Sequence, residues 1–487
     1  MNLTKTKFLK NLLGFSMVTW VSFLLGFIAT PISTRLFEPG ELAKVGMFGT
    51  YTALICSTCY LGLDQAFVRF FPELPGRLTQ RGLLSLCLSI TLGFCVLASA
   101  VMALFWRPLS AQVAGEADFT VFLCLCLYSL CAVVFRFLSL CYRMEKNALY
   151  YTVQGVIYAL LTKIAYLTVG FRDASGRAAI LTLTALMAGF AAVILMVQRK
   201  RLDPGFPRQL TRPAMSELTR YALPLVPLSL LSWLNSSVSS LALRQLLGLD
   251  ATGIYTSALG LASTVNIIQT GFNTYWAPYL LENYRNDEKA RFYTVHRLMA
   301  CLLTLFGLLL TLLQAPVFLL LGSSYRSSVV FFPFLFLSPI CYCLGETTGM
   351  GIMIAKKSYW TTIIYLFSAL LNIILCFLLI PSFGLPGAAL ASALSAILTL
   401  LMRTAVGERF YQSIKTYRYL AYTIGLMLFV SFANLLLTGV TKYALLIGAL
   451  GLACVLYRSE LRILWNTTRE ILKAGRDFLS RRARAKR

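Results

Sequence analysis

The chain has 487 residues, of which 58% are hydrophobic and only 13% are charged. Its formal net charge of +25 is spread over short segments between apolar stretches and over a C-terminal tail. Basic residues near anionic lipid headgroups gain roughly 1 kcal/mol each, so membrane lipids explain this charge and no nucleic-acid partner is predicted.

Apolar stretches that are long enough to cross a bilayer recur about fourteen times along the chain. A helix needs about 20 predominantly apolar residues to cross a hydrocarbon core of about 30 Å, and its backbone satisfies its own polar groups. The sequence therefore predicts an all-α, polytopic membrane protein. In chain order, the predicted spans are 11–36, 43–66, 82–106, 119–141, 149–170, 178–198, 219–245, 251–280, 294–321, 328–355, 359–380, 386–406, 418–437 and 441–457.

The basic residues lie almost entirely in every second gap between the spans. Of the 44 Lys and Arg residues, seven fall in the alternate gaps and three lie within spans, so 34 share one face with both termini. By the positive-inside rule this predicts that both termini are cytoplasmic. The seven on the other face are Arg35, Lys44, Arg107, Arg172, Arg177, Arg326 and Lys442.

A weak internal repeat appears when the chain is shifted against itself by 209 residues. The shift aligns similar residues at corresponding span ends, for example Gly62 with Gly271 and Glu73 with Glu282. Spans one to six therefore look duplicated as spans seven to twelve, which predicts two six-helix lobes around a central cavity and two extra C-terminal helices. The predicted parts are an N-lobe (1–201), a cytoplasmic linker (202–218), a C-lobe (219–410), two further helices (411–457) and a basic cytoplasmic tail (458–487).

Four ionisable residues are predicted to lie at membrane depth, where a charge costs about 3 kcal/mol or more unless it faces water or a partner. Arg136 and Arg244 are near enough to span ends for their side chains to reach a lipid headgroup. For these two residues, a headgroup contact and a functional role in the cavity both stay open. Lys163 lies deeper, which favours a cavity-facing role. Glu346 has glycines around it and prolines upstream, which indicates a bent helix and a functional carboxylate whose charge a base such as Arg136 would favour.

Polar residues at helical spacing mark two further spans. Two Asn and a Gln on one helical face are better explained by a hydrated cavity than by helix packing alone. The residues predicted to line this cavity are Asn235, Ser239, Asn266, Gln269 and Asn273. The chain has no Walker, HExxH or GxSxG motif, so we expect neither an enzyme nor ATP use, and no catalytic or metal site.

Several short segments resemble the multidrug/oligosaccharidyl-lipid/polysaccharide exporter superfamily, and within it the bacterial polysaccharide transporters of the Wzx flippase type. The segments that carry the resemblance are 62–71, 253–255, 355–357 and 387–389. The resemblance implies a flippase that moves polyprenyl-pyrophosphate-linked oligosaccharides across the bacterial inner membrane, with possible polysaccharide assembly proteins as partners. It implies no cofactor and leaves H⁺ or Na⁺ coupling open.

The resemblance also implies which residues bind the substrate. Basic residues would hold the pyrophosphate and the sugars, Arg as a bidentate fork and Lys as a point charge. The candidates for substrate binding are Arg35, Arg69, Arg136, Lys163 and Arg244, and the candidates for ion coupling are Glu346 and the boundary residue Asp64.

Three rival functions stay open. A lipid II flippase of the same superfamily would be expected to carry basic residues deeper in the first two spans. A drug or cation antiporter would be expected to carry a carboxylate within the spans of the first lobe. A membrane scaffold that transports nothing needs no buried ionisable groups.

Overall fold

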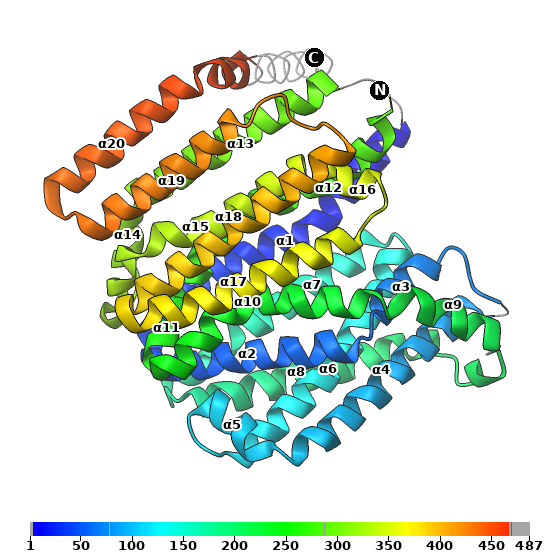
Figure 1. Ribbon diagram of the computed structural model, residues 1–487. Coiled ribbons are helices and arrows are strands. Elements are labelled where there is room, and N and C mark those ends of the chain that lie inside the picture. The colour runs from blue at the N-terminus through cyan, green and yellow to red at the C-terminus, as the bar shows by residue number, and fades with distance from the viewer. Residues whose placement is uncertain (1–2, 77, 210, 286–288, 467–468, 470–487) are drawn as a thin grey trace, which may run out of the picture.

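The computed structural model describes residues 3–76, 78–209, 211–285, 289–466 and 469, and every regular element in these ranges is a helix. Long helices run alongside one another in a single bundle (Figure 1). In the first half of the chain the α-helices are α1 (Leu3–Leu36), α2 (Pro39–Cys59), α3 (Leu63–Phe70), α4 (Gln80–Ala103), α5 (Trp106–Ala114), α6 (Phe119–Met144), α7 (Ala148–Lys163) and α8 (Gly176–Gln198).

The second half repeats this series of helices and then adds two. Its α-helices are α9 (Arg212–Ala222), α10 (Leu225–Leu246), α11 (Gly248–Ala262), α12 (Asn266–Asn283), α13 (Lys289–Leu312), α14 (Gln314–Leu319), α15 (Phe332–Thr348), α16 (Met350–Ile354), α17 (Tyr359–Phe383), α18 (Leu385–Phe410), α19 (Arg418–Leu436) and α20 (Gly439–Leu456). The 3₁₀ helices are η1 (Ala165–Phe171), η2 (Arg199–Arg201), η3 (Phe206–Gln209), η4 (Ser263–Val265) and η5 (Ser323–Val330).

Polar side chains fix where several of these helices begin. The Asp118 carboxylate accepts a hydrogen bond from the Thr120 backbone N–H at 2.8 Å, at the start of α6. Thr79 caps α4 and Ser175 caps α8 in the same way. Each cap satisfies backbone donors that would otherwise lack a partner in the first turn.

Eleven helices in the described part of the chain are long and apolar enough to cross a membrane, and the pair formed by η5 and α15, bent by 63°, would make twelve. The chain is therefore a multi-pass membrane protein. The predicted number of fourteen is not confirmed, because spans 43–66 and 251–280 form helices that are not among the twelve. Much of α2 lines an internal cavity, so polar residues replace lipid-facing apolar ones there.

The helix bounds repeat along the chain at the spacing found in the sequence. Helix α4 begins at Gln80 and α13 at Lys289, 209 residues later, and both have 24 residues. The same shift carries the start of α2 onto that of α11, and the start of α8 onto that of α18. The lobe limits at 201 and 219 stay a prediction. Helix α9 begins inside the predicted linker and packs on α3.

The bundle has two ends, which we name by a residue at each. The Pro39 end holds the corner between α1 and α2, with α5 and the start of α11, while the Gly62 end holds α3, α9 and α16 (Figure 1). At the Pro39 end the two halves touch through their backbones, since a Cβ atom on Gly253 would lie 1.9 Å from the Pro39 carbonyl oxygen. Tyr325 also donates a hydrogen bond from its hydroxyl to the Phe37 carbonyl at 2.9 Å.

The two additional helices pack on the second half of the chain. Residues of α19 and α20 share one buried apolar cluster with α11, α13, α15 and α18. At the bend before α15, the Asn434 amide of α19 donates to the carbonyls of Val329 and Val330, both at 2.8 Å. Gln314 in turn donates to the Asn434 side-chain oxygen at 2.5 Å. Helix α19 therefore satisfies backbone groups that the bend leaves without helical partners.

Of the predicted basic tail, residues 467–468 and 470–487 lie outside the described residues.

Candidate functional site

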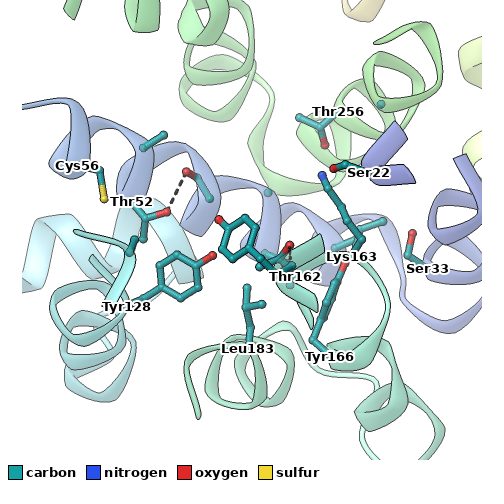
Figure 2. Close-up of a pocket in the computed structure, with 18 of the residues that line it drawn as sticks. Ser22, Ser33, Thr52, Cys56, Tyr128, Thr162, Lys163, Tyr166, Leu183 and Thr256 are labelled. Atoms are coloured by element: carbon teal, nitrogen blue, oxygen red, sulfur yellow. Dashed lines mark hydrogen bonds between the residues drawn. The ribbon is translucent and has the colours of Figure 1, made fainter. Parts of the chain in front are cut away.

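A cavity of about 710 Å³ lies within the first half of the bundle and reaches α11 of the second half. Its lining is rich in hydroxyl groups and carries one charged side chain, Lys163, so we call it the Lys163 cavity. Figure 2 shows Lys163 reaching into the cavity, with its amine pointing toward Ser22 and Thr256. The polar lining residues are Ser22, Thr30, Ser33, Thr52, Cys56, Ser57, Tyr60, Tyr128, Tyr158, Thr162, Lys163, Tyr166, Thr256 and Ser257.

Lys163 is held in the cavity by a break in its helix. It is the last residue of α7, and the chain continues after Ile164 as the 3₁₀ helix η1. Its side chain is exposed to the cavity and forms no hydrogen bond or ion pair with any residue that the structure describes. An amine at this depth keeps its charge only in a wet cavity or beside an anion. The Lys163 cavity therefore offers one free positive charge among neutral hydroxyl groups.

A second cavity of about 510 Å³ also borders Lys163 and is lined partly by α1, α6 and α7. The two cavities share Ser22, Tyr158 and Lys163 among their lining residues. Arg136 also lines this second space, which we call the Arg136 cavity. Two of the residues predicted to bind substrate, Arg136 and Lys163, are thus brought to one connected region.

Arg136 and Asp64 form an ion pair. The Arg136 Nη2 atom lies 2.7 Å from the Asp64 Oδ2 atom, and the Arg136 Nε atom also donates to this oxygen at 3.3 Å. The Asp64 side chain is 9% exposed, whereas that of Arg136 is 40% exposed. Gln65 donates a further hydrogen bond to the Asp64 carboxylate at 2.9 Å. Arg136 therefore neutralises a buried carboxylate while keeping part of its guanidinium open to the cavity.

We expect Arg136→Ala to lower the stability of the protein by about 1–3 kcal/mol, because it leaves the buried Asp64 carboxylate without its main partner. Thermal unfolding of the purified protein in detergent measures this effect. The matched control is Arg69→Ala, since the pair of Arg69 with Glu73 is exposed and surface ion pairs contribute little to stability. Equal losses in the two variants would show that the Asp64 pair is not structural.

A third cavity lies where the two halves of the chain meet, and a fourth lies within the second half. The Asp64 cavity has a volume of about 580 Å³ and shares Ser57 and Tyr60 with the Lys163 cavity. The Ser368 cavity has a volume of about 190 Å³ and shares Ser232, Tyr342 and Tyr365 with the Asp64 cavity. A series of adjoining cavities thus extends from Lys163 into the second half.

Glu346 pairs with Arg403, so the suggestion that Arg136 is its nearby base is wrong. The Arg403 Nη1 atom of α18 lies 3.0 Å from the Glu346 Oε1 atom of α15, and the two side chains are only 13% and 23% exposed. Arg136 is unavailable because it pairs with Asp64. Both carboxylates predicted to couple ions are therefore paired with arginines, and Glu346 lines none of the four cavities described above.

Sequence analysis missed Arg403, which lies near the end of its predicted span. Two glycines one turn apart make room for it, since a Cβ atom on Gly345 would lie 3.3 Å from its Nη1 atom and one on Gly349 would lie 3.1 Å from its Nε atom. Its guanidinium carbon also lies 5.5 Å from the centre of the Tyr342 ring. The glycines around Glu346 indicate a close approach at this helix in the sequence, but they do not identify Arg403 as the residue that packs there.

The other three predicted substrate-binding residues lie elsewhere. Arg35 lines a cavity of about 420 Å³ at the Pro39 end. Arg69 is exposed on α3, where hydrogen bonding to Glu73 raises the pKa of its guanidinium. Arg244 donates to the backbone carbonyls of Gln112 and Ala111 at 3.0 and 2.8 Å, and lines none of the five cavities. The structure does not bring these three arginines together with Lys163.

Of the five predicted cavity-lining residues, Asn235 lines the Ser368 cavity. Ser239 is buried against Cys376 and lines none of the five cavities. The remaining three lie on α12 and are likewise absent from the cavity linings: Asn266, Gln269 and Asn273.

The fold is shared with solved transporter structures. The structure of "Lipid II flippase MurJ, inward closed conformation" is similar, with a TM-score of 0.65 and 15% identity, over 92% of this chain and 99% of that chain. The inward-facing conformation of a multidrug resistance MATE family transporter of the MOP superfamily has a TM-score of 0.54 and 15% identity, over 82% of this chain and 95% of that chain. At this identity the likeness concerns the fold.

The sequence itself matches one family model. A search of curated protein sequences gave no match. The model of a family described as polysaccharide biosynthesis protein matches residues 8–284, which is more than half of the chain and includes every residue of the Lys163 cavity. The resemblance noted in the sequence is thereby confirmed, and the chain belongs to the polysaccharide biosynthesis protein family, with the fold of the MOP superfamily transporters.

Proposed function

We propose that the protein is a flippase that moves polyprenyl-pyrophosphate-linked oligosaccharides across the bacterial inner membrane by alternating access. The observation that carries this proposal is the unpaired amine of Lys163 in a hydroxyl-lined cavity of about 710 Å³. A point charge of this kind suits a pyrophosphate, and the surrounding Ser, Thr and Tyr hydroxyl groups suit its oxygens and the first sugars. The polyprenyl chain would stay in lipid.

The distribution of basic residues gives the orientation in this proposal. The Gly62 end carries the gaps rich in Lys and Arg and would face the cytoplasm together with both termini. The closely packed Pro39 end would then face outward, and its contacts would shut the outer side in this conformation. The lipid-linked sugar would enter from the cytoplasmic side, and polysaccharide assembly proteins would receive or deliver it.

The charge of the cavity separates this proposal from a drug antiporter. A free lysine amine attracts an anionic headgroup and repels the cationic compounds that such an antiporter would carry. Both candidate coupling carboxylates, Asp64 and Glu346, already have arginine partners. Coupling to H⁺ or Na⁺ through either residue would require its ion pair to open during the transport cycle.

The test is flipping of a fluorescent undecaprenyl-pyrophosphate trisaccharide by the purified protein in liposomes. We expect Lys163→Ala to slow flipping by about 10- to 150-fold, because a hydrogen bond to a charged group contributes about 1.5–3 kcal/mol. Lys163→Arg should restore most of the rate, since it keeps the positive charge. Lys442→Ala is the control, because Lys442 lies on α20 and lines none of the five cavities.

Lipid II offered in the same assay distinguishes the related activity. If the protein flips lipid II faster than the undecaprenyl-pyrophosphate trisaccharide, its proposed substrate would change to lipid II. Wild-type rates for Lys163→Ala on both lipids would remove the basis of the proposal.

A further inference from the structure

The Ser368 cavity in the second half of the chain differs chemically from the Lys163 cavity. Of the described residues, those that line it include no charged side chain. They include aromatic, hydroxyl and amide groups that come from α10, α15, α17 and α18. Its polar lining residues are Ser232, Asn235, Ser236, Ser338, Tyr342, Tyr365, Ser368, Asn372, Ser392, Ser395 and Thr399.

Hydrogen bonds within the protein hold this lining in place and leave capacity for a ligand. The Asn235 amide donates to the Leu231 carbonyl at 3.0 Å and to the Tyr365 carbonyl at 2.8 Å, so its side-chain oxygen is the group left to accept. The hydroxyl groups of Thr399, Ser368 and Ser395 bond to one another, at 2.7 Å between Thr399 and Ser368 and at 2.9 Å between Ser368 and Ser395. Each hydroxyl has one donor and two acceptor positions, so these contacts use donors and leave acceptor positions for a ligand.

Two tyrosines give the cavity an apolar face beside the polar groups. Tyr342 and Tyr365 line both the Ser368 cavity and the Asp64 cavity. An aromatic ring presents a broad apolar face with a polar tip, and a sugar ring likewise has faces of C–H groups and an edge of hydroxyl groups. The volume of about 190 Å³ is of the size of a single sugar ring.

The position of this cavity allows one molecule to reach both chemical environments. The Asp64 cavity shares Ser57 and Tyr60 with the Lys163 cavity on one side. On its other side it shares Ser232 with the Ser368 cavity. A substrate with an anionic end and a neutral, hydroxyl-bearing end would therefore place the two ends in different halves of the protein.

We propose that the Ser368 cavity binds a neutral sugar of the lipid-linked glycan while Lys163 binds its pyrophosphate. This inference rests on the proposed function and adds the substrate class that the second half recognises. Uncharged sugars suit the site because each charge placed among neutral hydroxyl and amide groups would lose hydration without gaining a counter-ion. Selection among glycans would then be made in the second half and anchoring of the lipid headgroup in the first.

The experiment measures binding of two fluorescent probes to the full-length protein in nanodiscs. One probe is undecaprenyl pyrophosphate without sugar, and the other carries a neutral trisaccharide of hexose and N-acetylhexosamine units. We expect the wild-type protein to bind the trisaccharide lipid about tenfold more tightly, equal to about 1.4 kcal/mol. Ser232→Phe and Ser236→Phe fill the cavity from two exposed positions on α10, and each should abolish this tenfold gain.

The controls separate the sugar site from the pyrophosphate site. The two Phe variants should bind the sugar-free lipid within about twofold of wild type, which also shows that they fold, whereas Lys163→Ala should weaken both lipids by the same factor. Ser216→Phe, at an exposed position of α9 outside the five cavities, should keep the tenfold gain.

Two outcomes would overturn the inference and leave the flippase proposal standing. They are equal affinity of the wild-type protein for the two lipids, and a gain that persists in both Phe variants. If the wild-type protein binds neither lipid, the proposed function itself fails.

Discussion

Glu346→Ala is expected to destabilise the protein by about 3–5 kcal/mol, because it leaves the Arg403 guanidinium buried without a counter-charge. Arg403 is only 13% exposed and lies in the space left by Gly345 and Gly349. Most of its side chain would therefore stay out of water while α15 and α18 remain packed together. Thermal unfolding of the purified protein in detergent, followed by tryptophan fluorescence, measures the loss.

A double variant identifies the partner of Glu346. Glu346→Ala combined with Arg403→Met removes both charges and should recover much of the lost stability, since apolar residues can replace a buried ion pair at little cost. Glu346→Ala combined with Arg136→Met should be no more stable than Glu346→Ala alone. Recovery with Arg136→Met, and none with Arg403→Met, would contradict the pairing.

The predicted ion-coupling role of Glu346 requires a separate measurement. Glu346→Gln keeps the shape and one acceptor oxygen but removes the charge. A coupling carboxylate predicts that flipping in liposomes continues but no longer responds to a pH or Na⁺ gradient. An ion pair with a purely structural role predicts reduced stability with unchanged gradient dependence.

Gly253→Val is expected to open the Pro39 end. A Cβ atom at Gly253 would lie 1.9 Å from the Pro39 carbonyl oxygen, which is backbone and cannot rotate away. Overpacking typically costs 1–3 kcal/mol, so conformations in which α2 and α11 separate should gain roughly 5- to 150-fold in population. The effect is measured as labelling of Thr256→Cys, in the Lys163 cavity, by a membrane-impermeant thiol reagent added outside cells.

The control for this change is a glycine with free space around it. A Cβ atom at Gly189 in α8 would meet no heavy atom within 4 Å, so Gly189→Val should leave the labelling of Thr256→Cys unchanged. The parent protein without Thr256→Cys measures the background from the native cysteines. Equal labelling with Val at either glycine would show that the Gly253 contact does not close the cavity.

Apolar length was sufficient to predict the helical class, because lipid imposes the same requirement on every span. It was insufficient for the exact number of spans. The α2 region was predicted as a span from its length, yet α2 lines the Lys163 cavity with Gly46, Gly49, Thr52 and Ser57. A helix that faces water inside the bundle does not need the apolar surface of a helix that faces lipid.

Candidate site residues were predictable when position alone decided their environment. Lys163 was predicted to face a cavity because it lies too deep to reach a headgroup, and the structure places it in one. Arg244 has the same charge, yet its partners are the backbone carbonyls of Ala111 and Gln112. These oxygens belong to a segment more than 130 residues away in the chain, and no local pattern in the sequence indicates that they need a donor.

The contacts of Asn434 have a consequence for the two helices that the repeat does not include. Because this residue of α19 bonds to Val329 and Val330 of η5, two hydrogen bonds tie α19 to the segment before the bend. Any displacement of η5 during a transport cycle must carry α19 with it or break both hydrogen bonds in an apolar environment. The additional helices would thus move with the second half instead of supporting it from a fixed position, and a change at Asn434, which lines none of the five cavities, would alter this motion.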